Sequence, residues 1–450
     1  MGLYILFFVI YVIVVLTIGI ISSRKETEED FMIAERKVKG VQLAATMTAG
    51  FFDSAVLSVY VAYLYQYGFS AIWIFVGIIV GFIILRIYAA RIKQKADTMK
   101  VYSMPEYFFK ILGKKNGLMF SIFLVIQFII FLIINFIVAG KVLSAIFPVH
   151  YAVAVIFGGL IILTYLLMAG FKAVIRTDFF QLIITFVMAL TVGIFLFGRT
   201  HIPASDINLT SLGTGNIIGF LILGGLSTLV APDLWQRMFA SKDKKTLNRG
   251  LWYSTAALLL GALVVAVLGL STKQFFPHIA PEDALVTGFS KLLPYGLKQF
   301  GMVLLYGVAL SSSDTVIFVL SSIFTRDLKN YTEKYSEESM KKLARFFMII
   351  VVLFAIIIAV SYQNIISFGL AFGSLNLALF PVVFGTLYWQ LKERAVFWAL
   401  IVSLLSVAVL FITKQFTPAN SVIVLPIALI SLLIFSKAFK RQELSNKSIL

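Results

Sequence analysis

An aspartate stands in the middle of an apolar stretch, where a carboxylate is costly. Asp53 lies in the segment FFDSAVL, inside the mostly apolar run from 38 to 67. An ionised aspartate at the centre of a membrane span costs about 3 kcal/mol on insertion scales, so a compensating group is expected. Sodium, a solute ammonium or a proton could compensate the charge. Alternatively, Asp followed by Ser is a good N-cap, in which the carboxylate accepts hydrogen bonds from the free N–H groups of a helix that begins there.

A cluster of serines marks a second apolar run. The stretch ALSSSDTVIF, from 309 to 318, contains three consecutive serines followed by Asp314. Na⁺ is a hard cation that prefers oxygen ligands, which a purely apolar helix does not offer. Ser311 and Ser312 are adjacent, so both hydroxyls could reach one ion if a neighbouring carbonyl completes the shell. The alternative is that these serines bind their own backbone or allow helices to pack closely.

Four further residues in apolar segments could contact a solute or simply support the fold. Gln127 and Asn135 are eight residues apart and could share a face toward a cavity. Such amides more often make hydrogen bonds between helices. Lys141 is expected to extend toward the membrane surface. Trp73 could line an outer vestibule or act as an interfacial anchor.

The composition places these residues in a membrane protein. The 450 residues are 60% hydrophobic and 13% charged, whereas soluble domains carry about 25% charged residues. Apolar runs long enough to cross a bilayer recur from end to end. The sequence has no cysteine, its three histidines lack metal-ligand spacing, and it contains no glycine-rich phosphate loop ending in Lys and Ser or Thr. We therefore expect no enzyme activity, no cofactor and no metal other than Na⁺ as a coupling ion.

The loops account for the net charge of +17. Basic residues concentrate in alternate loops, which the positive-inside rule assigns to the cytoplasm. This threading puts the N-terminus outside and the C-terminus in the cytoplasm. The thirteen predicted spans are residues 3–22, 40–65, 69–90, 116–146, 151–169, 174–198, 215–236, 249–272, 294–325, 343–361, 364–388, 395–413 and 421–438.

The second and seventh predicted spans are interrupted. The segment AATMTAGFFDSAVLS, from 44 to 58, contains Gly50 and Asp53 at mid-depth. The segment LGGLSTLVAPDLW, from 223 to 235, contains two glycines and Pro232. Paired broken helices at corresponding positions of two halves indicate an inverted-repeat transporter. The alternative is a pair of ordinary helices with small residues at packing faces.

Three polar motifs together resemble those of the sodium:solute symporter family, the family of the bacterial proline and sodium/galactose symporters. They are YLLMAGFKAVIRTDFFQ, PDLWQRMFASKD and ALSSSDTVIFVLSSIFTRD, and the shorter DFMIAERKV and MPEYF support them. The resemblance covers essentially the whole chain. It implies an all-α polytopic membrane protein of about 13 transmembrane helices, with a five-plus-five inverted-repeat (LeuT-type) core in which the first helix of each repeat is broken. The expected parts are one transporter domain over 1–450, an extra N-terminal helix at 1–22, repeats at 40–198 and 215–388, and two peripheral helices at 395–438.

The resemblance also implies where ions bind. The sodium site shared by the family uses two hydroxyls and three backbone carbonyls, which correspond here to Ala49, Phe52, Val308, Ser311 and Ser312. A second cation site of some members corresponds to Asp178, Asp314 and Thr315. Asp314 replaces a hydroxyl by a carboxylate, so this second site could be stronger or could carry a proton. Alternatively, Asp314 forms a structural ion pair or caps a polar cluster.

Asp53 departs from the family pattern, because most relatives have a small residue at this position. In the distantly related amine neurotransmitter transporters, the equivalent position is an aspartate that pairs with the amine of the solute. The resemblance therefore implies an amine-bearing or cationic solute. The expected solute contacts are Phe51, Asp53, Ser54, Trp73, Gln127 and Gly225.

We expect a secondary active symporter of a bacterial cytoplasmic membrane, in which inward sodium flow drives uptake of a small organic solute by alternating access. Proton coupling through Asp53, Asp178 or Asp314 is one alternative. A solute sensor that works with a separate signalling partner is another. The expected partners are the solute, Na⁺ and membrane lipid, with no nucleic acid and no obligatory protein partner.

Overall fold

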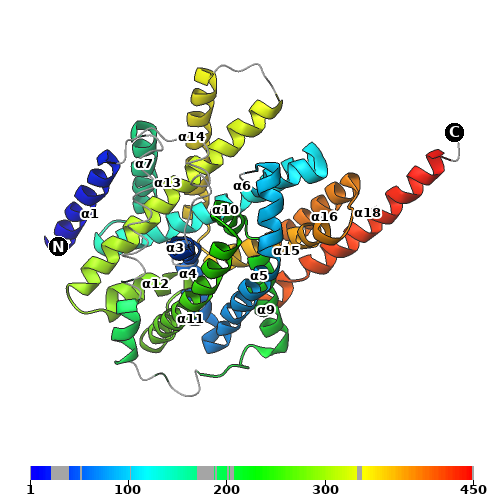
Figure 1. Cartoon of the computed structure of the whole chain (residues 1–450). Helices are drawn as coiled ribbons and strands as arrows, with labels where there is room; N and C mark the ends of the chain where they lie inside the picture. The colour runs from blue at the N-terminus through cyan, green and yellow to red at the C-terminus, as the bar shows by residue number, and fades with distance from the viewer. Residues whose placement is uncertain are drawn as a thin grey trace.

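Every element in the described part of this computed structural model is helical (Figure 1). The structure describes residues 2–21, 40–50, 53–101, 103–169, 187, 190–199, 202, 207–331 and 337–447. The helices are α1 (Gly2–Ile21), α3 (Gly40–Ala49), α4 (Ser54–Tyr67), α5 (Trp73–Met99), α6 (Met104–Ile146), α7 (Tyr151–Ala169), α9 (Gly213–Leu229), α10 (Pro232–Ala240), α11 (Lys244–Phe275), α12 (Ala284–Thr287), α13 (Leu297–Tyr331), α14 (Glu337–Ser361), α15 (Ile365–Tyr388), α16 (Glu393–Ile412), α17 (Pro418–Ser421) and α18 (Val424–Lys447).

The predicted spans correspond to these helices, except for 174–198, most of which lies outside the described residues. Within the described part, eight helical stretches are long and apolar enough to cross a membrane, and one of them, Ser54–Met99, joins α4 to α5. The total of thirteen spans therefore stays a prediction. Large apolar side chains such as Leu259, Leu263 and Leu433 are exposed on the outer helices, as expected where the surrounding solvent is lipid.

Both predicted helix interruptions are present. α3 ends at Ala49 and α4 begins at Ser54, after Asp53 has adopted an extended backbone with φ −62° and ψ 150°. α9 ends at Leu229 and α10 begins at Pro232, after Ala231 has adopted φ −65° and ψ 116°. Proline lacks an N–H group and drives the preceding residue out of the helical region, which explains the second break.

Gly224 and Gly225 do not form the second break, because α9 continues through both of them. They allow α9 to approach α5 closely instead. A Cβ atom at Gly224 would lie 2.2 Å from the carbonyl oxygen of Ile74, and one at Gly77 would lie 2.5 Å from that of Leu221. Small residues that let two membrane helices touch backbone to backbone are a common packing device.

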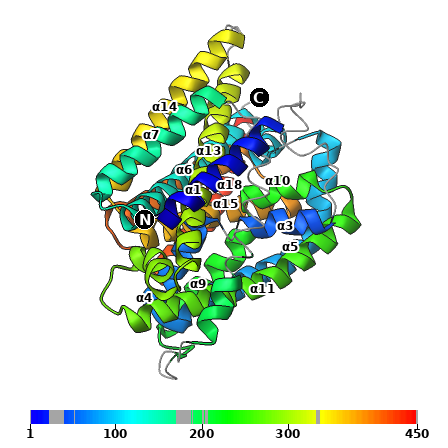
Figure 2. The ribbon, with the colours of Figure 1, turned by 90° about the vertical axis from the view of Figure 1, so that its left-hand side faces the viewer.

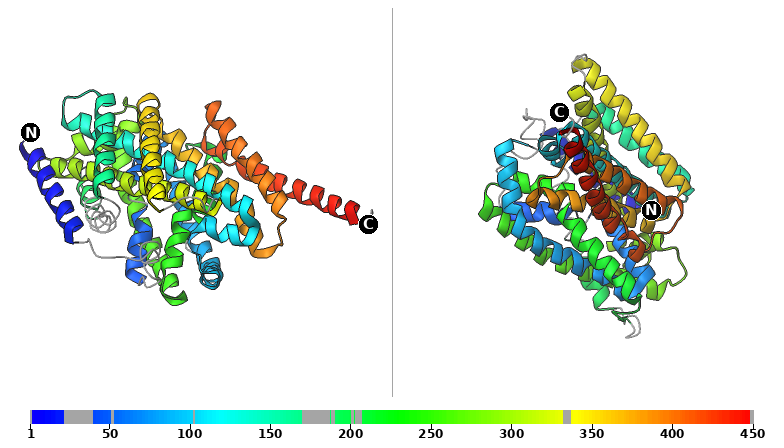
Figure 3. Two further views of the ribbon diagram at one scale, coloured as in Figure 1. Left: turned by 90° about the horizontal axis from the view of Figure 1, so that it is seen from above. Right: turned by 90° about the vertical axis from the view of Figure 1, so that its right-hand side faces the viewer.

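The central helices are enclosed by more peripheral ones. α13 packs against α6. α7 and α14 lie side by side, and both contact α6 and α13 (Figure 2). α1 contacts α13 at the periphery, and α16 and α18 pack against each other on the opposite side. Seen from above, the two termini lie at opposite ends of the molecule (Figure 3). Residues of both helix breaks line one cavity together with residues of α6, α13 and α15.

Candidate functional site

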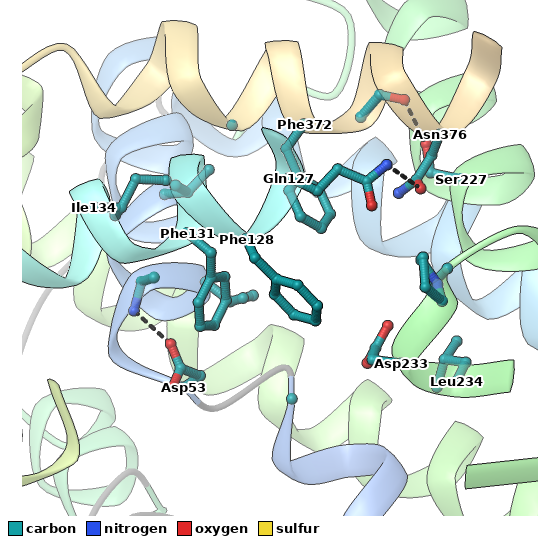
Figure 4. Close-up of a pocket in the computed structure, with 18 of the residues that line it drawn as sticks. Asp53, Gln127, Phe128, Phe131, Ile134, Ser227, Asp233, Leu234, Phe372 and Asn376 are labelled. Carbon is teal, nitrogen blue, oxygen red and sulfur yellow. Dashed lines mark hydrogen bonds between the residues drawn. The ribbon is translucent and has the colours of Figure 1, made fainter. Parts of the chain in front are cut away.

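A cavity of about 430 Å³ lies where the two broken helices meet α6, α13 and α15. Most of its lining is apolar, and Figure 4 shows the side chains of Phe128, Phe131 and Phe372 around it. Its polar lining residues are Asp53, Tyr60, Tyr63, Gln127, Ser227, Thr228, Asp233, Gln236, Arg237, Ser311, Ser312 and Asn376. An apolar cavity with a few convergent polar groups is the usual form of a small-molecule site.

Asp53 caps α4. Its Oδ1 accepts a hydrogen bond of 2.8 Å from the backbone N–H of Ala55, and its carbonyl oxygen accepts one of 2.8 Å from Leu57. The capping interpretation is therefore confirmed. The positive end of the α4 dipole lies next to the carboxylate, which reduces the cost of its burial. Asp53 also lines the cavity, so it caps α4 and faces the cavity at the same time.

The other carboxylate oxygen of Asp53 faces α13. Ser312 Oγ donates a hydrogen bond to Asp53 Oδ2. Val308 and Ser311, one turn and one residue before Ser312, line the same cavity. The fold thus brings the serine pair of α13 to the first helix break, as the predicted sodium site requires.

Several predicted ion ligands lie outside the described residues. They are Phe52 and Asp178 in full, and the side chains of Ala49, Asp314 and Thr315. Phe51, a predicted solute contact, also lies outside the described residues. The backbone of Ala49 is described, as the last residue of α3. The complete sodium shell and the second cation site therefore stay predictions.

The second helix break contributes an ion pair to the cavity. Arg237 Nη1 lies 2.5 Å from Asp233 Oδ2, one turn earlier on α10. The same guanidinium comes within 3.2 Å of the position that a Cβ atom would take on Gly50, in the first break. The two breaks therefore face each other across one end of the cavity. A side chain at position 50 would therefore press on the ion pair, whose guanidinium would have to shift.

Two hydrogen bonds between side chains cross between helices, which confirms hydrogen bonding between helices for Gln127 and Asn135. Gln127 Nε2 on α6 donates to Asn376 Oδ1 on α15 at 3.0 Å. Ser54 Oγ on α4 donates to Asn135 Oδ1 on α6 at 2.5 Å. Gln127 and Asn376 also line the cavity, whereas Ser54 and Asn135 do not.

Three of the proposed solute contacts lie away from the cavity lining. Ser54 is fully buried and is directed toward Asn135. Trp73 Nε1 donates to the carbonyl oxygen of Leu209 at 2.8 Å, which holds the start of α5 to the chain before α9. Gly225 packs against α5. Each of these residues thus has a contact within the protein, and solute contact for them stays a prediction.

Lys141 does not simply extend to the membrane surface. Its ammonium group forms an ion pair with Asp283, and its side chain is only 9% exposed. The same group lies 5.8 Å from the ring centroid of Tyr151, close enough for a cation–π contact. Lys141 therefore joins the end of α6 to the short turn Pro281–Asp283.

Sequence reasoning missed Asn376 and underrated Asp233 and Arg237. Asn376 is the only amide side chain in the otherwise apolar stretch LNLALF, from 375 to 380. An intramembrane polar residue of this kind is itself a signal of function. Asp233 and Arg237 belong to the motif PDLWQRMFASKD, but their position in the cavity depends on the break at Pro232.

Comparison with known proteins agrees with this arrangement. Residues 31–403 match the family model described as the sodium:solute symporter family. A sodium/proline symporter of Staphylococcus aureus (strain Newman) is 23% identical over 415 residues, covering 86% of this chain and 81% of that protein.

Two solved structures show the same fold. A Na⁺-coupled sialic acid symporter in a substrate-bound outward-open state superposes with a TM-score of 0.75 at 17% identity, over 96% of both chains. A nucleobase-cation-symport-1 family transporter in a closed conformation gives a TM-score of 0.58 at 13% identity, over 91% of this chain and 93% of that one.

Proposed function

Because this chain belongs to the sodium:solute symporter family, we propose that it is a sodium-coupled symporter that imports a small organic solute by alternating access. The observation that carries this proposal is the convergence of both helix breaks and the serine pair of α13 on one interior cavity. Unwound backbone at membrane depth is tolerated where it lines such a cavity. The free carbonyls of a break can then serve as ion ligands.

The sodium ion would join the first helix break to α13. In this proposal its ligands are the carbonyls of Ala49, Phe52 and Val308 and the hydroxyls of Ser311 and Ser312. The Asp53 carboxylate beside Ser312 adds negative charge next to the ion. In this proposal the first helix break and α13 lie together in the outward-open conformation, and sodium binds that conformation more tightly. Sodium therefore favours the outward-open conformation, since a ligand shifts an equilibrium only through differential affinity.

The geometry gives an amine-bearing solute no support. That suggestion rests on Asp53, whose two carboxylate oxygens already accept hydrogen bonds from Ala55 and Ser312. The solute of the proposal is therefore left as a small organic molecule that fits a largely apolar cavity. We also propose the remaining arrangement from the sequence: inverted repeats at 40–198 and 215–388, and a bacterial cytoplasmic membrane with the N-terminus outside and the C-terminus in the cytoplasm.

The test is uptake by purified protein in liposomes, screened with radiolabelled amino acids, carboxylates, sugars and amides under an inward sodium gradient. We expect one class of solute to accumulate only when the gradient is present, and replacement of sodium by choline to abolish accumulation. Uptake that continues in choline and collapses with a protonophore would refute sodium coupling in favour of proton coupling.

A further inference from the structure

One buried acceptor at the cavity lacks a hydrogen-bond donor. Gln127 is 1% exposed, and its Oε1 has no partner among the described residues. Its Nε2 is satisfied by Asn376 Oδ1 at 3.0 Å, and Asn376 is also 1% exposed. Buried polar atoms are nearly always hydrogen-bonded in native proteins, so an unsatisfied one calls for an explanation. A bound solute that donates to this oxygen would supply one.

The amide pair is part of the cavity wall and carries both a donor and an acceptor. Figure 4 shows the oxygen of Gln127 and the nitrogen of Asn376 on the same side of the hydrogen bond that joins the two residues. The Gln127 oxygen points toward the space between Phe128 and Asp233. Rotating both amides by a half turn exchanges their roles but leaves one donor and one acceptor on that side.

Two charged groups of the cavity, Arg237 and Asp233, form an ion pair, and the third, Asp53, lies beside the proposed sodium ion. Arg237 is 2.5 Å from Asp233, and Asp53 accepts hydrogen bonds from Ala55 and Ser312. The amide pair is therefore a neutral part of the cavity lining that has an unsatisfied acceptor. This favours a solute whose polar end is neutral.

Aromatic side chains lie next to the amide pair. Phe128 and Phe131 follow Gln127 on α6, and Phe372 precedes Asn376 by one turn on α15. Rings beside a polar anchor favour a flat apolar body in the solute, because offset-stacked and edge-to-face ring contacts add to the energy of burial.

From this geometry we propose that Gln127 and Asn376 bind the carboxamide or lactam group of a neutral solute with an aromatic or apolar body. The adjacent N–H and C=O of such a group match the Gln127 oxygen and the Asn376 N–H. This inference rests on the proposed transport function and narrows its substrate to one chemical class.

The test compares four probes of nearly equal size on purified protein: benzamide, benzoate, benzylamine and acetophenone. Each is titrated in a thermal-stability assay, with sodium and with choline. We expect benzamide to stabilise the protein more strongly than the other three, and more strongly in sodium. The absence of stabilisation by benzamide, or stronger stabilisation by benzoate or benzylamine, would overturn the proposal.

The variant Gln127→Leu removes the acceptor while keeping the side-chain volume. We expect it to bind benzamide at least about tenfold more weakly, because a polar group that loses its partner in a buried site costs the complex that much or more. Stabilisation by sodium should persist in this variant, so that loss of solute recognition is distinguished from loss of sodium binding. Equal affinity of the variant and the unmodified protein for benzamide would contradict the proposal.

Asn116→Leu provides a matched control for the loss of a buried amide. Asn116 lies on the same helix, is 1% exposed, and donates to the carbonyl oxygens of Leu112 and Glu393 outside the cavity. This variant should be less stable but should keep the affinity for benzamide. Equal loss of benzamide binding in both variants would show that the effect is one of folding, and would overturn the assignment of Gln127.

Discussion

Ser312 on α13 donates a hydrogen bond to the carboxylate of Asp53 at the start of α4. The two residues are far apart in the chain, and this contact joins the first helix break to the helix that carries the serine pair. Family resemblance places sodium ligands on both sides of the same contact. The hydrogen bond therefore identifies the junction at which ion binding could hold the two elements together.

The cap formed by Asp53 can be separated from its charge. Asn is as good an N-cap as Asp, whereas Ala costs about 1 kcal/mol. We expect Asp53→Asn to retain near-normal stability in choline and Asp53→Ala to unfold at a lower temperature, measured by thermal denaturation in detergent. Both variants should bind sodium more weakly, since both lose the negative charge beside Ser312. Equal stability of the two variants in choline would contradict the capping role.

Close packing of α5 against α9 should not tolerate a methyl group at Gly224. A Cβ there would lie 2.2 Å from the carbonyl oxygen of Ile74, which is backbone and cannot rotate away. We expect Gly224→Ala to destabilise the protein by about 1–3 kcal/mol or more, the usual range for overpacking. Gly215→Ala on the same helix is the control, because its Cβ would meet only Ala419 at 3.7 Å. Similar melting temperatures for both variants would contradict this packing.

The buried pair of Ser54 and Asn135 should stabilise the junction of α4 and α6. Ser54→Ala leaves Asn135 Oδ1 without its donor, and an unsatisfied buried acceptor costs about 1–3 kcal/mol. Ser403→Ala is the matched control, because the buried Ser403 donates only to the carbonyl oxygen of Ala399 on its own helix. We expect a clear decrease in melting temperature for the first variant and little change for the second. The reverse order would show that the pair between helices is not stabilising.

Much of the fold could be predicted from the sequence because the relevant signals are local. Apolar run length placed the helices, and Pro232 marked one break through its own backbone chemistry. The capping potential of Asp53 was equally local. The role of Gly225 was not, since its packing depends on Gly77 on another helix.

Side-chain partners across helices could not be predicted from a single sequence. Gln127 meets Asn376 across 249 residues and Ser54 meets Asn135 across 81, and nothing in either segment specifies its partner. Asn376 therefore went unnoticed, although it completes the amide pair. The polar groups of the cavity became recognisable as one site only when the helices were placed together.

The most direct test of the account is a sodium titration of thermal stability in Ser312→Ala. Ser313→Ala is the control, because Ser313 is the next residue, is buried, and donates to the carbonyl oxygen of Ala309 on its own helix. We predict that sodium affinity decreases at least about tenfold in Ser312→Ala, as expected when a charged partner loses a polar ligand, and is unchanged in Ser313→Ala. Sodium affinity in Ser312→Ala equal to that of the unmodified protein would contradict the central claim that sodium binds between α13 and the first helix break.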